Sequence, residues 1–281
     1  MAFTPPRAPA SGGVCAFEFL SFDAGMIKAK QLGSNPIRKV LSSIQSQRVQ
    51  ALLMGGQACV FYGAAEFSRD TDLAILAEAA NLERLDAALA ELDAEVIAVP
   101  PFKTDFLLRG HAVHFRCRHR DAAGMRVDVM AKMRNVDEFP LLWERRTEVA
   151  LPDGFTVAML GIEDLVAAKK TQRDKDWPMI RRLVEAHYLE HRSNPSPAAI
   201  GFWFRELRTA ELLVEAAVRH PESLRAAIGA RPLLVHAASA NLDALFAGLR
   251  DEEDRERALD RAYWKPLRAE LERLRHGAKP G

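Results

Sequence analysis

Apolar side chains recur with two different periods along the chain, and the change between them divides it into two parts. Up to about residue 190, short apolar runs of strand length alternate with segments in which apolar residues recur at helical spacing. After Val157 no further run is typical of a strand, and the remaining segments have helical spacing. The pattern therefore predicts a mixed α/β part followed by an all-helical part.

Glycine and asparagine residues mark where several of these elements begin or end. Gly55-Gly56 stops the first apolar run, Gly63 closes a short helix, and Asn81 is expected to cap the helix that follows the second strand. In chain order, the predicted elements are helix 37–44, strand 49–54, helix 57–62, strand 72–76, helix 81–92, extended segment 96–99, strands 111–118 and 125–130, and helices 162–172 and 177–188.

Composition adds a boundary on each side of the α/β part. Residues 1–34 are rich in Pro, Ala and Gly and are expected to form a disordered N-terminal extension. Residues 35–192 are the predicted α/β domain, a small mixed sheet with flanking helices. A Ser/Asn/Pro cluster at 192–197 is the predicted linker to a C-terminal helical region, residues 193–281.

Charge and cysteine usage limit the partners and the compartment. Lys and Arg number 39 against 38 Asp and Glu, so no global positive field draws the chain to nucleic acid or to a membrane surface. No apolar run approaches the roughly 18–20 residues that cross a bilayer, so no membrane partner is expected. Three widely spaced cysteines are typical of free thiols in a reducing compartment, which predicts a cytoplasmic protein.

The segment with the most candidate functional residues is 54–72, which contains Gly55-Gly56 and two aspartates. Asp70 and Asp72 lie two apart at the head of a predicted strand, so they project from one face and repel each other unless a cation lies between them. Glycines without side chains let a phosphate approach the backbone N–H groups. This combination indicates an anion site beside a divalent-metal site.

Met54-Gly55-Gly56, thirteen further residues and Asp70-Thr71-Asp72 resemble the signature of the nucleotidyltransferase superfamily with the DNA polymerase beta-like fold. The segment 62–72 is more similar still to a bacterial branch that includes the AbiEii abortive-infection toxin type. Ser68 stands where that branch has Thr, and Glu66 stands where it has Arg.

The resemblance implies a third carboxylate, which Asp128 offers on the strand 125–130, and a two-metal Mg²⁺ site formed by Asp70, Asp72 and Asp128. It implies an NTP as substrate and transfer of a nucleoside monophosphate to an acceptor hydroxyl. Five further residues are expected to hold phosphate groups: Gly55, Gly56, Ser68, Lys169 and Arg173. Lys169 and Arg173 are four apart and are expected to share a helix face.

The acceptor stays open at this level. An RNA acceptor such as a tRNA end follows from the toxin-like resemblance, a small-molecule hydroxyl follows from antibiotic-modifying relatives, and a cognate antitoxin is a partner that the sequence does not identify. Residues 169–192 hold seven Lys or Arg against four Asp or Glu, which favours an anionic acceptor there. A third alternative is a nucleotide- or partner-binding module without turnover, indicated by Glu66 and by Met179 at a position where the branch often has Asp.

Overall fold

The computed structural model describes residues 36–65 and 68–277. The predicted disordered extension, residues 1–34, and Glu66 lie outside them. The α/β part runs through helices α2 to α7 and strands β1 to β7. In chain order these are α2 (Pro36–Ser46), β1 (Ala51–Met54), α3 (Gly55–Phe61), β2 (Asp70–Ile75), α4 (Ala79–Glu91), β3 (Ala94–Val96), α5 (Thr104–Arg109), β4 (Val113–Cys117), η1 (Arg120–Ala122), β5 (Arg126–Met130), α6 (Phe139–Glu144), β6 (Thr147–Ala150), β7 (Thr156–Met159) and α7 (Ile162–Ala168).

The seven strands in the described part of the chain form one mixed sheet, in the order β3-β4-β5-β2-β1-β7-β6. Strand β2 pairs in parallel with β5 and antiparallel with β1, so it lies at the centre of the sheet. Strand β1 also pairs in parallel with β7. The predicted mixed sheet with flanking helices is confirmed, and its centre is built from the strands that carry Asp70, Asp72 and Asp128.

One face of the sheet is apolar and covered. Leu73 and Ile75 of β2 are almost fully buried, as are Val113 and Phe115 of β4, because alternate residues of a strand point to the same side. Helix α2 lies on this face, where Leu41 and Ile44 share a cavity wall with residues of β1 and β2. Burial of the odd-numbered residues of β2 fixes its register. The even-numbered aspartates therefore project from the opposite face.

The helical part confirms the prediction from apolar spacing. It contains α8 (Asp176–His191), α9 (Pro197–Glu206), α10 (Ala210–Arg219), α11 (Pro221–Ile228), α12 (Leu234–Ala238) and α13 (Leu242–Gly277). The centre of the cluster is aromatic: the Tyr188 and Trp203 rings meet edge to face with their centroids 4.7 Å apart, and Phe202 and Phe204 are buried. The division at residue 192 stays a prediction, and α8 packs on α9 across it.

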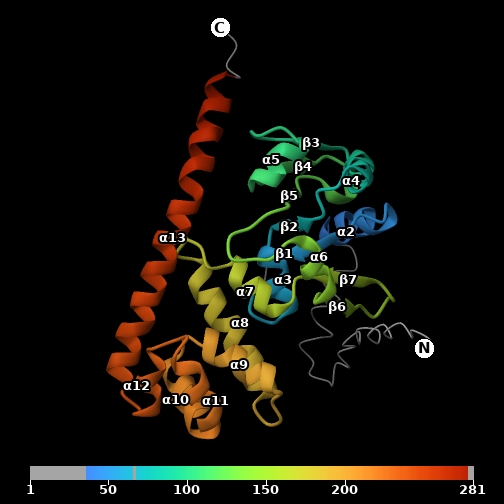
Figure 1. Cartoon of the computed structure of the whole chain (residues 1–281). Coiled ribbons are helices and arrows are strands. Elements are labelled where there is room, and N and C mark those ends of the chain that lie inside the picture. Colours follow the sequence, from blue (N-terminus) through green and yellow to red (C-terminus); the bar gives the residue numbers. More distant parts are fainter. Residues whose placement is uncertain (1–35, 66–67, 278–281) are drawn as a thin grey trace, which may run out of the picture.

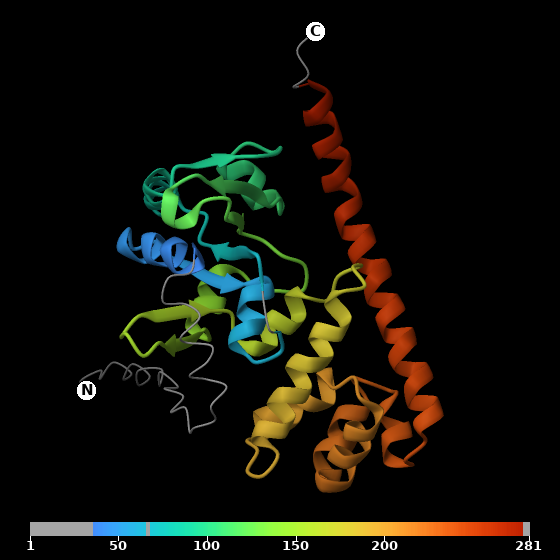
Figure 2. The same cartoon turned by 180° about the vertical axis from the view of Figure 1, so that it is seen from behind.

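Helix α13 joins the two parts of the molecule. It begins beside α12 and runs past α8 to the level of α5 and β3, as the two opposite views show (Figures 1 and 2). Its first half packs in the helical cluster through Leu245 and Leu249, and its second half lies against the α/β part, where Leu267 is buried. None of the helices in residues 36–65 and 68–277 combines the length and the apolarity that a membrane crossing requires.

Three local predictions need correction. Asn81 lies inside α4 and does not cap it; its side chain instead bonds the backbone N–H and C=O of Gln50 and the C=O of Leu76. Helix α7 ends at Ala168 rather than at 172, because Thr171 and Asp176 hold the next residues in a turn. The edge hairpin β6–β7 is absent from the predicted elements, since its strands are short and mostly half-buried.

The acidic and basic residues of the charged run 250–275 are typical of a solvated helix face with local ion pairs. Arg257 and Glu253 do pair locally. Other side chains of α13 instead reach the α/β part: Asp260 is buried and accepts a hydrogen bond from the backbone N–H of Gln172, and Glu256 pairs with Arg134. The run therefore serves as an interface as well as a surface.

Candidate active site

Three carboxylates of the candidate site lie on one face of the sheet. In the parallel pair β2–β5, Asp72 is directly beside Asp128, and Asp70 is beside Arg126. Partner residues on paired strands point to the same side, and so do residues two apart on one strand. Asp70, Asp72 and Asp128 therefore project together from the face opposite the apolar core, as the sequence predicted.

The two glycines form the floor against which Asp72 and Ser68 pack. Gly55 has a positive φ of 66°, and a Cβ there would lie 1.8 Å from Asp72 Oδ2. A Cβ on Gly56 would lie 2.8 Å from Ser68 Oγ, and this hydroxyl donates to the C=O of Asp70. The sequence therefore needs glycine here, because any side chain at residue 55 would occupy the place of the carboxylate.

The surroundings of Asp72 disfavour its ionised carboxylate. Burial is the main cause that raises its pKa to about 6, and the charges of Asp128 and Asp70 add to it, while Lys169 and the backbone N–H of Gly56 act in the opposite direction. An ionised group that is buried beside two like charges is stabilised by a cation. Its environment therefore favours a positively charged ligand.

Asp128 already has two partners that the sequence interpretation missed. Arg126 Nε donates to Asp128 Oδ1 at 2.7 Å, and His114 Nδ1 lies 2.9 Å from the same oxygen. Burial acts to raise the pKa of Asp128, but these two contacts lower it below the usual value. Strand alternation could have predicted Arg126, because residues two apart on one strand share a face. His114 lies opposite Asp128 on the neighbouring strand β4.

Lys169 and Arg173 do not share a helix face, because α7 ends before them. Both contact Asp176: Lys169 Nζ lies 3.5 Å from Asp176 Oδ1, and Arg173 Nε donates to Asp176 Oδ2 at 2.7 Å. Lys169 is buried, and its charge acts on the pKa values of Asp72 and Cys59, so it lies beside the candidate site. Arg173 is exposed and is joined to Asp176 rather than to the three acids.

The donor chemistry of the site suits magnesium only in part. Carboxylate oxygens are the ligands that Mg²⁺ prefers, and Asp70 and Asp72 present them from one strand face. Asp128 shares its carboxylate with a guanidinium. Within residues 36–65 and 68–277, no three His, Cys, Asp or Glu side chains are gathered as a set of metal ligands. Asp70 and Asp72 are thus the residues that fit the ion best.

Three other reactive or charged side chains, Cys59, His111 and Lys170, are engaged within the fold. Cys59 is fully buried, burial raises the pKa of its thiol to about 11, and its Sγ donates to the C=O of Gly55, which argues against a nucleophile. His111 lies 2.7 Å from Glu270 of α13. Within the basic stretch 169–192, Lys170 pairs with Glu206 at 2.7 Å, so its charge is already neutralised.

Comparison with known proteins does not assign the chain to a family. No protein-family model matches the chain, and no curated protein matches it significantly. Among solved structures, the chain is similar to one from H. pylori described as a "putative nucleotidyltransferase", with 12% sequence identity and a TM-score of 0.37, over 84% of this chain and 97% of that one. A likeness of this size carries no argument about activity, so any function has to be inferred from the site itself.

Proposed function

We propose that this protein is a metal-dependent nucleotidyltransferase that moves a nucleoside monophosphate from an NTP to an acceptor hydroxyl. The observation that carries the proposal is the register of β2 and β5, which puts Asp72 beside Asp128 on the face that also bears Asp70. The resemblance of residues 54–72 to the nucleotidyltransferase signature supports it, and the AbiEii type is the branch to which the motif is most similar.

The proposed roles follow from where each side chain lies. Asp70 and Asp72 would hold the magnesium ion that accompanies the NTP, and Asp128 would help to hold a second ion. Gly55 and Gly56 would offer backbone N–H groups to phosphate oxygens beside the Asp72 and Ser68 side chains, which pack against them. When bound, magnesium neutralises phosphate charge and lowers the pKa of the acceptor hydroxyl.

In the proposed reaction, the acceptor hydroxyl releases its proton to solvent and its oxygen forms a bond to the α-phosphorus, while the bond from that phosphorus to pyrophosphate breaks. Lys169, buried beside Asp72, would offset negative charge that develops on the leaving group. Ser68 would contact a phosphate oxygen, and its hydroxyl is already oriented by the C=O of Asp70. Arg173 would take part only by leaving Asp176, which it contacts at 2.7 Å.

The acceptor is proposed to be RNA, with a small-molecule hydroxyl as the competing acceptor. Lys175 and Arg182 support RNA because both are exposed near the start of α8, and neither has an ion pair among the described residues. Replacing both with Ala should reduce the dependence of RNA binding on salt by up to about one unit of slope per lost phosphate contact. A parent protein whose acceptor KM does not depend on salt would contradict an RNA acceptor.

The direct test is transfer of label from each of the four α-labelled NTPs, in the presence of magnesium and total RNA. We expect the parent protein to label RNA and Asp72→Asn to give none. Asp254→Asn, which removes the same charge from an exposed position on α13, is the matched control and should label RNA as the parent does. Absence of label in every acceptor fraction with all four NTPs would overturn the proposal.

The contacts of Asp128 favour one second candidate, a nucleotide-binding module without turnover. Arg126 and His114 occupy the carboxylate that a second metal would need. In that case the parent protein would bind a magnesium–NTP complex and would transfer no label. Equilibrium binding of each NTP, measured beside the transfer assay, separates the two functions.

A further inference from the structure

A cavity of about 420 Å³ lies in the helical part, outside the candidate active site. Its wall comes from the start of α8, the first half of α13 and the α9–α10 connection, which contributes Arg208. The wall holds four arginines, Arg181, Arg208, Arg250 and Arg257, but only two carboxylates, those of Asp174 and Glu253. Both carboxylates pair with Arg257, so three arginines face the cavity without being neutralised by them.

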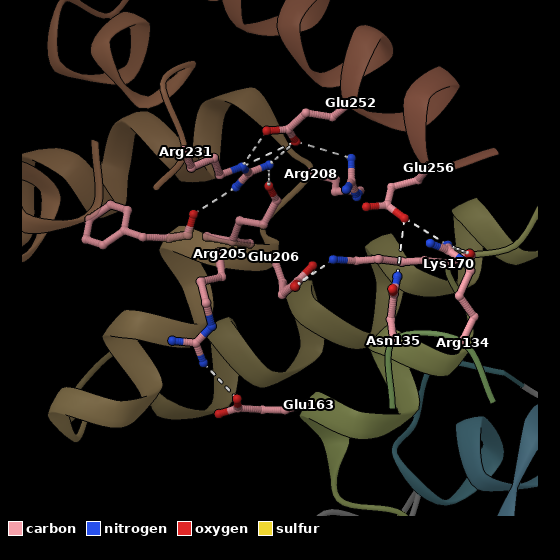
Figure 3. A network of polar contacts seen from close by, with 12 residues as sticks. Arg134, Asn135, Glu163, Lys170, Arg205, Glu206, Arg208, Arg231, Glu252 and Glu256 are labelled. Atoms are coloured by element: carbon pink, nitrogen blue, oxygen red, sulfur yellow. Dashed lines mark hydrogen bonds and ion pairs between the residues drawn. The ribbon is translucent and has the colours of Figure 1, made fainter. Parts of the chain in front are cut away.

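Arg208 is a buried cation with incomplete partners. Only 7% of its side chain is exposed, and within the described residues neither its Nε nor its Nη1 has a hydrogen-bond acceptor. Its ion-pair partner, Glu252, is 3.6 Å from Nη1 and is held more closely by Arg231 at 2.8 Å (Figure 3). A buried guanidinium that lacks acceptors is costly, so its donors need a ligand that supplies them.

Arg208 is also held in position. Its guanidinium carbon lies 4.7 Å from the centre of the Trp177 ring, and the indole N–H of Trp177 is fixed by the C=O of Thr171. Arg181 and Arg250 line the same cavity from α8 and α13; both are exposed and have no ion pair among the described residues. Three guanidinium groups thus surround one space, and one of them is fixed by packing.

The cavity has an apolar side as well. Leu249 and Phe246 of α13 line it, and the Phe246 side chain is 50% exposed although it is a large hydrophobic residue. The volume lies within the range of small-molecule sites and exceeds what a single inorganic anion needs. Guanidinium groups favour phosphate because their N–H groups match its oxygens in pairs.

We propose that this cavity binds a small organic phosphate monoester, whose phosphate group contacts Arg181, Arg208 and Arg250 and whose apolar body lies on Phe246 and Leu249. The site does not require the proposed transfer reaction. The turn 169–176 lies between the two sites, with Lys169 beside Asp72 on one side and Asp174 beside the cavity on the other.

The test is calorimetric titration with phenyl phosphate and with inorganic phosphate, without metal or nucleotide, so that failure of the proposed transferase function would not affect the result. We expect phenyl phosphate to bind more tightly than inorganic phosphate by at least about fivefold, because only phenyl phosphate reaches Phe246. The double variant Arg181→Gln/Arg250→Gln should weaken phenyl phosphate by at least about tenfold.

The matched control is Arg261→Gln/Arg268→Gln, which removes the same charge from exposed positions of α13 outside the cavity. It should bind phenyl phosphate as the parent does. Arg208→Met should also lose binding. Because Arg208 is buried, its replacement can also disturb the fold, so the test of the proposal is the double variant at the exposed Arg181 and Arg250. An equal loss in the control pair, equal affinity for the two probes, or no binding by the parent at millimolar concentration would each overturn the proposal.

Discussion

At the scale of single residues, Asp72 links the proposed chemistry to stability. Its folded pKa of about 6 is above the ordinary value of 3.8, so the folded state holds the proton more tightly than the unfolded state does. The ionised carboxylate therefore destabilises the fold above pH 6, and this cost disappears as the pH falls toward 4. The site keeps a group that the fold alone does not favour.

Asp72→Asn should consequently be more stable than the parent, by on the order of 1–2 kcal/mol at pH 7, with the difference vanishing near pH 4. Thermal unfolding at both pH values measures this. Added magnesium should raise the Tm of the parent and leave that of the variant unchanged, because only the parent keeps the Asp72 carboxylate that would bind the ion. A variant that melts below the parent at pH 7 would show that the carboxylate has a structural role.

Gly55 provides a second test at this scale, with Gly154 as its control. Both glycines have positive φ, 66° and 81°, but a Cβ on Gly154 would meet nothing within 4 Å. Gly154→Ala should cost about 1 kcal/mol of stability from backbone strain alone. Gly55→Ala should cost at least twice as much in urea unfolding, since its Cβ would collide with Asp72. Equal costs would mean that Asp72 can move away freely.

Arg126 competes with any cation for the acidic face. It donates to Asp128, and the charges of Asp128, Asp70 and Asp72 help to raise its pKa. Arg126→Gln should therefore bind Mn²⁺ several-fold more tightly than the parent in a relaxation titration, because a positive charge leaves the site. Arg225→Gln, on α11 and paired only with Glu222 among the described residues, should leave the affinity unchanged. Unchanged or weaker affinity in Arg126→Gln would show that Arg126 does not compete.

At the scale of elements, the contact between α8 and α9 depends on a neutral histidine. The indole N–H of Trp203 donates to His187 Nδ1 at 2.9 Å, and the His187 ring stacks on His191 with 4.3 Å between centroids. Burial, together with the charge of His191, lowers the pKa of His187 to about 4 from 6.5. The unfolded chain therefore takes up this proton first, and stability is lost as the pH falls from 6.5 toward 4.

We expect the loss attributable to His187 between pH 7 and pH 5 to be on the order of 1–2 kcal/mol. His187→Gln should show a shallower decline of unfolding free energy across this range in urea titrations. His276→Gln, at an exposed position near the end of α13, should decline as the parent does. Parallel declines for all three proteins would assign the acid sensitivity to other groups.

The elements also show what a sequence can and cannot predict. Alternation of apolar residues predicted the buried face of β2 and β5, and with it the shared face of the three aspartates, because strand period is a local property. Of the two partners of Asp128, Arg126 lies two residues away on the same strand, whereas His114 comes from the register between β4 and β5, which no local period contains. The end of α7 was missed for a similar reason: Asp176 holds Lys169, Thr171 and Arg173 through contacts that only the folded turn creates.

At the scale of the whole molecule, the second half of α13 is anchored to the α/β part through few side chains. Glu270 contacts Arg109 at 3.0 Å and His111 at 2.7 Å, and Tyr263 packs on Gly110. Glu270→Ala should increase hydrogen exchange in residues 263–277 while protection of β2 and β5 persists. Glu272→Ala, an exposed neighbour on the same helix, should leave exchange unchanged. Identical exchange in both variants would show that Glu270 is not the anchor.

The path of α13 has a consequence for how the protein is made. A ribosome synthesises every strand of the sheet before it reaches α13, and chains of this size begin to fold from the N-terminal side. Until α13 has emerged, Gly110 and His111 lack the cover that Tyr263 and Glu270 later provide. We therefore expect the nascent α/β part to expose this patch to chaperones during translation. The patch becomes covered only when α13 docks.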